Sequence, residues 1–467
     1  MATASIVQLQ AVDKPQFYRP PISQSSTDKA TELLQDNHER HHIFFNADGF
    51  HNHIAHQLLT IWSLGATPEE LQRGYDTNKS YQRPARKPES TIVQGLQDPA
   101  TFMSHLGVEQ HYNDFLEFFR QEIDKKGWQH VLKQYVFAGD ERAETMLVRM
   151  FAGLLHPIIH LGFGLEFQQP AIIAEALAQA ACHDDWIGEV LLPAEAAAEK
   201  NGNNDKTIVE LIHEIHNHKE IREAPRWSDS NKIRDGLLAR AAQPLIDIIS
   251  QIHIPPEAEA EAEEKEKEIL TRQTAEMTHA AILLTAGAQR AHKAIKFDFF
   301  LMHSVNATIF WPILNRQAWL SPTQKIRLLE WKIRFDLVLY ASRKSPEIRR
   351  DEIRGYAPKV VQKQNQNQKQ KQQEDHQEAG WDDILERACR VDDDGHAAKL
   401  VRAVANGEQV CRPFEGQKGS ELAGEDWLKL GYMVIDSVEM EVGERWVRNA
   451  GFEEAWENVP ERGVGGK

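Results

Sequence analysis

The sequence predicts an all-α protein, and two observations support this prediction. Apolar residues recur at helical spacing over long stretches, and no run of alternating polar and apolar residues ends in a hairpin turn dipeptide. The chain has 467 residues, of which 41% are hydrophobic, so it is long enough to bury a large core. We therefore expect a single large helical domain.

Four segments carry the helical prediction. Residues 146–167, MLVRMFAGLLHPIIHLGFGLEF, are apolar on nearly every face, as expected of a helix buried inside a large α-protein. Pro157 removes a backbone donor from this helix and should kink it locally. Residues 297–311 are again apolar almost all round, and residues 170–182 and 325–342 predict two further helices.

Two polar segments do not fit a helical core. Residues 255–268, PPEAEAEAEEKEKE, predict a solvated loop or an exposed helix start. Residues 363–377, KQNQNQKQKQQEDHQ, have low complexity and no apolar face, which predicts disorder. Because candidate site residues occur on both sides of each, we interpret them as flexible insertions in one domain. That domain would span residues 31–467, after an N-terminal extension of residues 1–30.

Charge and cysteine content exclude several classes of protein. A formal net charge of −16 argues against nucleic acid as a partner, because its phosphates require clustered Lys and Arg. The three cysteines, Cys182, Cys389 and Cys411, lack the paired spacing of a disulfide framework or a CxxC metal site. The N-terminus does not resemble a signal peptide, and no stretch reaches the ~18 uninterrupted apolar residues of a membrane span. We therefore expect a cytoplasmic protein without a membrane partner.

The 21 histidines are the unusual feature of the composition, and six of them lie between residues 38 and 56. A buried imidazole needs a hydrogen-bond partner, a metal or a catalytic task, because burying it unpaired costs roughly 1–3 kcal/mol. His53 and His56 are three residues apart and share a helix face, opposite the main apolar stripe. This face points either to solvent or to a polar internal cavity, and the spacing does not decide which.

Two histidines lie one turn apart in the most apolar helix, namely His156 and His160. A pair on one face of a buried helix modestly favours contact with a ligand or substrate over a structural role. His303, in FFLMHSVNA, has apolar neighbours on nearly every side. For a single histidine in such surroundings, a hydrogen-bonded core position is the commoner explanation.

The segment DDDGHAAKLVRAV places one more histidine near a lysine. Asp394 or a neighbouring aspartate can cap a helix that begins near Gly395, which puts His396 and Lys399 on one helix face. The alternative is an ordinary solvated stripe that also includes Arg402.

Other chemistries lack their sequence signatures. There is no GxGxxG after a strand, no GxxxxGK[ST], no HExxH and no GxSxG, and no two-His-one-carboxylate pattern is legible. From the residues alone, the chain is an α-helical protein with scattered buried imidazoles that suit iron or zinc. A non-catalytic helical binding protein, whose histidines only complete a hydrogen-bonded core, is the alternative.

Five segments in order resemble the questin oxidase-like family: HNHIAHQLLTIWSLGATPEELQRGYDTNKSYQRP, HPIIHLGFGLEF, FDFFLMHSVNATIF, LLEWKIRFDLVLYASR and DDGHAAKLVRA. They extend from about residue 38 to residue 407, and the two polar segments fall between them. The resemblance implies an oxidoreductase of fungal secondary metabolism that opens the ring of an anthraquinone such as questin. Its substrate would be a small aromatic polyketide.

The resemblance allows two chemistries. One is an NADPH-dependent Baeyer–Villiger monooxygenation. The other is a non-haem Fe(II) oxygenase with O₂ as co-substrate, whose metal is held by four histidines and an N-carboxylated lysine. The missing nucleotide-binding fingerprint favours the iron oxygenase. NADPH stays a candidate there too, for reducing the quinone before cleavage.

Carried over segment by segment, the resemblance implies these metal ligands: His53, His156, His303, His396 and carboxylated Lys399. Lys332, in LLEWK, is the rival lysine. His56 and His160 would then orient ligands or take the phenol proton of the substrate as catalytic groups. One segment supplies each histidine, as expected of a metal and substrate site between core helices. Carboxylation requires a neutral lysine amine, and burial beside cationic groups lowers the lysine pKa enough to provide one.

Overall fold

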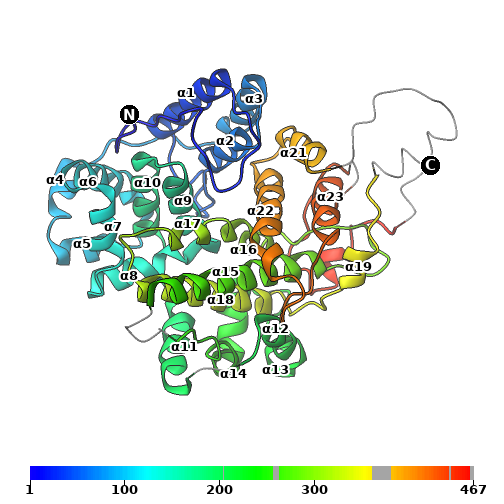
Figure 1. Ribbon diagram of the computed structural model, residues 1–467. Helices are drawn as coiled ribbons and strands as arrows, with labels where there is room; N and C mark the ends of the chain where they lie inside the picture. Colours follow the sequence, from blue (N-terminus) through cyan, green and yellow to red (C-terminus); the bar gives the residue numbers. More distant parts are fainter. Residues whose placement is uncertain (203–204, 256–261, 360–379, 441–442, 463–467) are drawn as a thin grey trace, which may run out of the picture. The chain divides into compact units, whose positions relative to one another are not determined.

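The computed structural model describes residues 1–202, 205–255, 262–359, 380–440 and 443–462. All regular secondary structure in these residues is helical, and the extended segments form only isolated β-bridges. The predicted all-α class is therefore confirmed. Figure 1 shows the helices in chain order.

The contacts within the described chain divide it into two compact units, each assembled from separated segments. Unit 1 consists of residues 1–188, 310–325 and 392–399, and unit 2 of residues 189–309, 326–391 and 400–467. The described part of the first polar segment belongs to unit 2.

Unit 1 contains the N-terminal helices. They are α1 (Gln24–Arg40), α2 (Ile54–Ser63), α3 (Pro68–Lys79), α4 (Ser90–Gly95), α5 (Pro99–His105), the 3₁₀ turn η1 (Glu109–His111), α6 (Tyr112–Lys126), α7 (Trp128–Val136), α8 (Glu141–Met150), α9 (Ala152–Glu166), α10 (Pro170–Cys182) and, later in the chain, α17 (Trp311–Asn315). The boundary suggested between residues 30 and 31 falls inside α1. The segment before α1 packs on this unit, where the Gln8 backbone N–H donates to Gln169 Oε1 at 2.9 Å.

Helix α10 is the central helix of unit 1, and it packs against both α6 and α9 (Figure 1). Its bounds are those predicted, because Pro170 is favoured in the first turn, where its missing N–H costs no hydrogen bond. Every residue from Ala171 to Cys182 is buried. One of them, Glu175, is charged and therefore requires polar partners inside the core.

The prediction of one kinked helix over residues 146–167 is wrong in detail. The structure has two helices there, α8 and α9, bent by 95°. The break does not follow Pro157 but precedes it, because Gly153, Leu154 and Leu155 adopt left-handed backbone angles. Proline is tolerated in the first turn of a helix, so Pro157 begins the regular part of α9 rather than kinking it.

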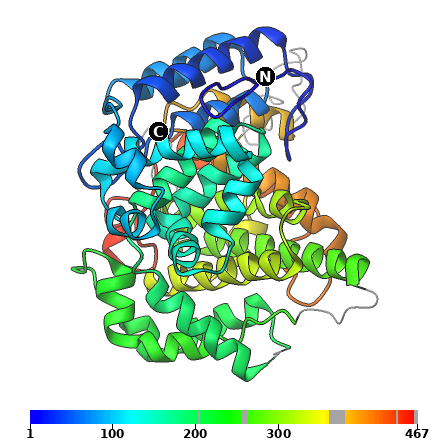
Figure 2. The same ribbon diagram turned by 90° about the vertical axis from the view of Figure 1, so that its left-hand side faces the viewer.

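Unit 2 contains the remaining helices. They are α11 (Gly188–Asn201), α12 (Ile208–Asn217), α13 (Lys219–Glu223), the π-helical η2 (Lys232–Leu238), α14 (Ala239–Ile249), α15 (Ala262–Gly287), α16 (Leu301–Thr308), most of α18 (Pro322–Ser342), α19 (Arg350–Arg354), α21 (Trp381–Cys389), most of α22 (His396–Cys411), η3 (Arg412–Phe414), α23 (Asp426–Val438) and η4 (Glu454–Trp456). The two long helices α15 and α18 run side by side in Figures 1 and 2, with Lys332 Nζ 3.7 Å from Met277 Sδ.

The sequence predictions for unit 2 are partly confirmed. Residues 325–342 lie in α18, as expected. The helix expected over residues 297–311 begins only at Leu301, because Asp298 Oδ1 accepts the backbone N–H groups of Phe300 and Leu301 and so caps it. From Ala262 the first polar segment is the start of α15, and residues 363–377 lie outside the described residues.

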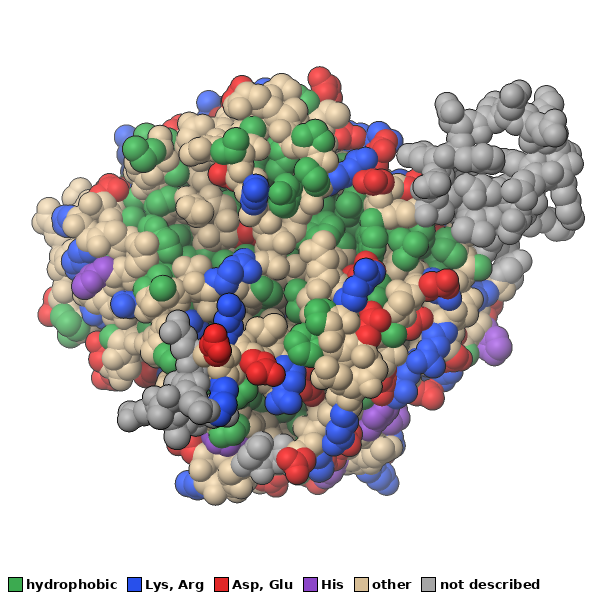
Figure 3. Space-filling view, in the orientation of Figure 1, with side chains coloured by type: hydrophobic (Ala, Val, Ile, Leu, Met, Phe, Trp, Pro, Cys, Tyr) green, Lys and Arg blue, Asp and Glu red, His purple; other side chains and the backbone are tan. Residues whose placement is uncertain are grey.

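No single helix within the described residues is long and apolar enough to cross a bilayer. Helices α8 and α9 pass this test only when taken together, across their bend. On the face that Figure 3 displays, acidic and basic side chains are intermingled rather than segregated by sign.

Packing around α9 leads to a first prediction. A Cβ added at Gly162 would lie 2.2 Å from Cγ of Phe310, whose ring is buried against α9. Gly162→Ala should therefore lower the free energy of unfolding by about 1–3 kcal/mol, although alanine favours the helix, and urea denaturation measures this loss. In a Phe310→Ala background the added methyl group has space, so the double variant should lose less than the sum of the single losses. Additive losses would contradict the packing described.

Candidate metal centre

Three of the histidines singled out in the sequence converge in unit 1. One ring nitrogen from each of His53, His156 and His396 lies within 4.8 Å of the others. His53 is the N-cap residue of α2, His156 lies in the first regular turn of α9, and His396 is the first residue of α22. All three are buried, and the rings of His53 and His396 meet edge to face with centroids 4.6 Å apart.

Each of these rings has its Nδ1 beside an acceptor. His156 Nδ1 lies 2.5 Å from the carbonyl oxygen of Gly153, and His396 Nδ1 donates to Asp394 Oδ1. His53 Nδ1 is 3.3 Å from Asp394 Oδ2. A neutral imidazole that carries its proton on Nδ1 keeps its lone pair on Nε2. The rings of His156 and His396 therefore offer Nε2 as the donor atom for a metal, whereas His53 Nδ1 makes no hydrogen bond within the described residues.

The spacing of the ring nitrogens fits either a shared proton or a cation. His53 Nε2 and His156 Nε2 are only 2.8 Å apart. Two lone pairs at this distance repel each other unless a proton or a cation lies between them. A proton serves one pair of nitrogens, whereas a metal ion is shared by all three. Neutral imidazoles suit iron and zinc, so this donor set fits such a metal.

Asp394 supplies the negative charge of the cluster. Burial opposes its ionisation, but His396 and His53 outweigh burial and hold the pKa of this carboxyl well below its usual range. Burial, together with the positive charge of Lys399, lowers the pKa of His53 to about 3, although Asp394 acts in the opposite direction. His53 is therefore neutral at physiological pH, as a metal ligand must be.

The backbone before His156 is strained. Leu154 and Leu155 have φ angles of 56° and 68°, a conformation that costs an ordinary residue roughly 1–2 kcal/mol. This turn brings the carbonyl of Gly153 to the ring of His156. In a regular helix that carbonyl would accept the N–H of residue 157, but Pro157 has none. The carbonyl is thus left to accept the Nδ1 proton of His156.

Lys399 lies three residues after His396, on the same helix, and is buried. Burial lowers the pKa of its ammonium group to about 8, although Asp394 and Asp393 oppose the shift. Within the described residues its Nζ has neither an ion-pair partner nor a hydrogen bond. The rival Lys332 differs, because its Nζ is paired with Asp336 one turn along α18, in unit 2.

His303 lies in unit 2, on α16, and is buried. Its Nδ1 is 2.8 Å from the carbonyl oxygen of Phe299, so it too carries its proton on Nδ1 and its lone pair on Nε2. This is the protonation that hydrogen bonds also give to His156 and His396.

His56 and His160 form a second buried network in unit 1. His56 Nε2 lies 2.9 Å from His160 Nδ1, and His160 Nε2 lies 2.7 Å from Glu175 Oε2. The other oxygen of Glu175 accepts from His38 Nδ1 at 2.6 Å. The ring of His56 contacts that of His53, with centroids 5.7 Å apart, and stacks on Phe163.

Burial decides the alternatives that the spacing left open. His53 and His56 are buried, so a solvent-facing pair is wrong. His396, Lys399 and Arg402 are also buried, which excludes a solvated stripe. The cap of α22 is Asp393, whose Oδ2 accepts the Ala397 N–H at 2.9 Å.

Sequence reasoning missed two carboxylates that contact the buried histidines, Asp394 as a partner of imidazoles and Glu175. Glu175 had a legible signal, because it is the one charged residue in the apolar segment PAIIAEALAQAAC. Such a residue must find a partner inside the core. Nothing in the sequence indicated that the partners are two histidines from distant segments.

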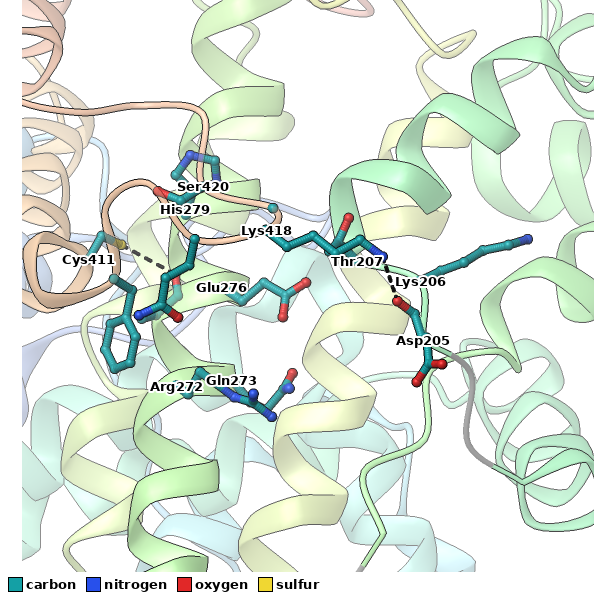
Figure 4. A pocket seen from close by; sticks show the side chains of 14 residues that line it. Asp205, Lys206, Thr207, Arg272, Gln273, Glu276, His279, Cys411, Lys418 and Ser420 are labelled. Carbon is teal, nitrogen blue, oxygen red and sulfur yellow. Dashed lines mark hydrogen bonds between the residues drawn. The ribbon is translucent and has the colours of Figure 1, made fainter.

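Unit 2 contains a separate cavity of about 300 Å³ beside α15 (Figure 4). Its polar groups are engaged by the fold. Glu276 accepts the first N–H of α12, and His279 Nε2 accepts two backbone N–H groups. Cys411 donates to the Ala275 carbonyl, and Lys418 to that of Asp205. The cavity therefore shows no set of catalytic groups.

Comparisons with known proteins agree with the resemblance seen in the sequence. The chain is 38% identical to "Baeyer-Villiger oxidase ptaJ" of Pestalotiopsis fici, over 98% of this chain and 99% of that protein. It is 38% identical to "Baeyer-Villiger monooxygenase AacuH" of Aspergillus aculeatus, over 94% and 91%. It is 37% identical to "Questin oxidase" of Aspergillus terreus, over 92% of each.

The family model described as "Questin oxidase-like" matches residues 50–404, a range that contains every site residue predicted from the sequence. These relatives are named as oxidases or monooxygenases, so the chain is an oxidoreductase. By this match over most of its length, the chain belongs to the questin oxidase-like family.

Proposed function

We propose that this chain is an oxygenase that uses O₂ and a non-haem iron to cleave a ring carbon–carbon bond of an anthraquinone-type polyketide in fungal secondary metabolism. The observation that carries the proposal is the convergence of three buried imidazole nitrogens in a member of this family. Relatives named questin oxidase supply the substrate class. The iron is proposed rather than zinc because the reaction requires a redox-active metal.

The ligand set begins with His53, His156 and His396. Lys399 is proposed as an N-carboxylated lysine, because it is buried, its ammonium pKa is lowered to about 8, and no carboxylate is paired with it. Carboxylation would convert its amine into an anionic oxygen ligand. Lys332 suits this role less well, since a carbamate there would stand against the Asp336 carboxylate. His303 completes the proposed set, on the strength of the family resemblance and of its Nδ1 protonation.

When bound, the metal would supply one-electron chemistry with O₂. The chain's own residues would hold the site in place: Asp394 and the Gly153 carbonyl fix the imidazole rings by their Nδ1 protons. His56 is neutral, because burial first and His160 second hold its pKa well below the usual value. It could therefore accept a proton from a phenolic hydroxyl of the substrate, with His160 behind it.

An NADPH-dependent Baeyer–Villiger monooxygenase acting on the same substrates is the second candidate. The printed names of several relatives favour it. A Baeyer–Villiger enzyme normally forms its peroxide on a flavin, and no flavin-binding signature is legible in the sequence.

The two candidates predict different contents of the purified protein. After expression in iron-replete medium, we expect close to one iron per chain by elemental analysis and no flavin absorbance. Ring cleavage should consume O₂, measured with an oxygen electrode. A bound flavin without iron, together with strict NADPH-dependent turnover, would support the Baeyer–Villiger enzyme instead. NADPH consumption alone would not, since it can serve to reduce the quinone first.

Removal of one clustered histidine tests the ligand set. His156→Ala should lower iron occupancy at least tenfold and abolish ring cleavage, because one of three converging lone pairs is lost. His42→Ala is the matched control: His42 is also buried in unit 1, and its Nδ1 accepts the Phe44 N–H. The control should keep its iron. Full iron occupancy and activity in His156→Ala would refute the site.

The two lysines are distinguished by a parallel pair of variants. Lys399→Ala should lower iron occupancy and turnover, and a short carboxylic acid added to the buffer should restore part of both by replacing the carbamate. Lys332→Ala should lose stability, because it leaves Asp336 buried without its ion-pair partner, but should keep iron when folded. Iron loss in Lys332→Ala with none in Lys399→Ala would reverse the assignment.

A further inference from the structure

Glu175 hydrogen-bonds to two histidines from helices far apart in the sequence, His38 of α1 and His160 of α9. It lies in the middle of the apolar helix α10, and one carboxylate oxygen faces each ring: Oε1 faces His38 Nδ1 at 2.6 Å and Oε2 faces His160 Nε2 at 2.7 Å. Burial disfavours the anion, but the hydrogen bonds from His160 and His38 prevail and lower the pKa of Glu175 to about 2. The carboxylate is therefore charged and accepts from both rings.

The charge of Glu175 determines where the neighbouring protons lie. A carboxylate only accepts, so His160 must carry a proton on Nε2. When neutral, His160 then has its lone pair on Nδ1, which faces His56 Nε2 at 2.9 Å. His56 must donate there through Nε2–H, which leaves the lone pair of His56 on Nδ1. This nitrogen is buried and has no hydrogen-bond partner among the described residues.

The protonation of His56 is thus opposite to that of the clustered ligands. His156 and His396 have Nδ1 protonated and their lone pair on Nε2, because their acceptors face Nδ1. His56, whose ring lies against those of His53 and His156, has Nε2 protonated and Nδ1 free. The difference originates at Glu175, two rings away.

We propose that Glu175 is a positioning residue that sets the protons of His160 and His56 through hydrogen bonds, so that His56 presents a bare Nδ1 beside the metal ligands. A bare nitrogen in this place accepts a hydrogen bond from a donor such as a phenolic hydroxyl. The catalytic consequence rests on the proposed function, whereas the position of the protons does not. His38 occupies the second carboxylate oxygen and so holds the Glu175 carboxylate in one orientation.

The positions of the protons are measured directly by NMR. Full-length protein labelled with [¹⁵N]histidine and loaded with zinc, which is diamagnetic, gives long-range ¹H–¹⁵N correlations that distinguish a bare ring nitrogen from a protonated one. The signals of His56 and His160 are assigned by their loss in His56→Phe and His160→Phe. We expect His56 with a bare Nδ1 and a protonated Nε2. A protonated Nδ1 in the parent protein would overturn the proposal.

Replacement of Glu175 then tests whether activity follows the protons. In Glu175→Gln, the side-chain amide accepts a hydrogen bond from one ring and must donate a hydrogen bond to the other. In the ring that accepts this bond, the proton therefore moves to the opposite ring nitrogen, which reverses the protonation of that ring. Where His160 reverses, His56 Nδ1 becomes protonated, and kcat should fall about 10–100-fold with iron content unchanged. Where only His38 reverses, kcat should stay within a factor of two of the parent. The proposal would be overturned if kcat fell while His56 Nδ1 stayed bare. It would also be overturned if His56 Nδ1 became protonated and kcat stayed at the parent value.

A matched control separates this effect from general destabilisation. Glu122 is another buried glutamate of unit 1, and Tyr135 donates to its Oε2 at 2.8 Å, with no histidine in contact. Glu122→Gln should lower stability by a similar amount but leave the His56 signals and kcat unchanged.

Should Glu175→Gln fail to fold, Glu175→Leu provides the same comparison, with both rings freed from their acceptor. If the parent protein cleaves no anthraquinone, the proposed function fails while the NMR result stands.

Discussion

The candidate site depends on one constraint: the Nδ1 protons of His156 and His396 have fixed acceptors. Asp394 supplies the acceptor for His396, and the Gly153 carbonyl supplies that for His156. With Nδ1 committed, Nε2 carries the lone pair of both rings, and one nitrogen of each ring lies within 4.8 Å of one nitrogen of His53. Without these acceptors each ring could exchange its proton between nitrogens, and three separate histidines would not form a donor set.

Both kinds of acceptor cost stability. A buried carboxylate such as Asp394 requires close partners, because isolated burial of its charge costs several kcal/mol. The left-handed turn at Leu154 and Leu155 costs roughly 1–2 kcal/mol per residue. Strain of this size persists only where the surrounding structure enforces it, and here it separates α8 from α9 and brings the Gly153 carbonyl to His156. The surrounding apolar packing of α9 and α10 holds this turn in place.

Unit 1 therefore has polar chains inside an apolar helical core. One chain runs from Asp394 through the clustered histidines, and the other from His38 through Glu175 and His160 to His56. They meet at the contact between the rings of His53 and His56. The protons are fixed on Nδ1 of His156 and His396 but on Nε2 of His56, so the cluster has lone pairs suited to a metal and His56 has one suited to a hydrogen-bond donor. An apolar core strengthens both effects, because water does not compete for these groups.

The sequence by itself determined the helical class, the bounds of α10 and the family. Apolar residues at helical spacing over whole segments leave little alternative to a helical fold. The bounds of α10 follow from a local rule, because the preference for proline in the first turn of a helix involves only neighbouring residues. The sequence also singled out histidines that are buried in the structure, because an imidazole in an apolar segment must have a partner.

Only the tertiary structure decided which of those partners each ring has. His53 and His396 are more than 300 residues apart in the chain, and Glu175 binds rings from α1 and α9, so no local pattern contains these pairs. The break before Pro157 was hidden for the same reason, since left-handed leucines are unfavourable locally and exist only because the packed core enforces them. Spacing along a helix shows which face a residue shares, but whether that face is buried, and against what, depends on segments that fold onto it.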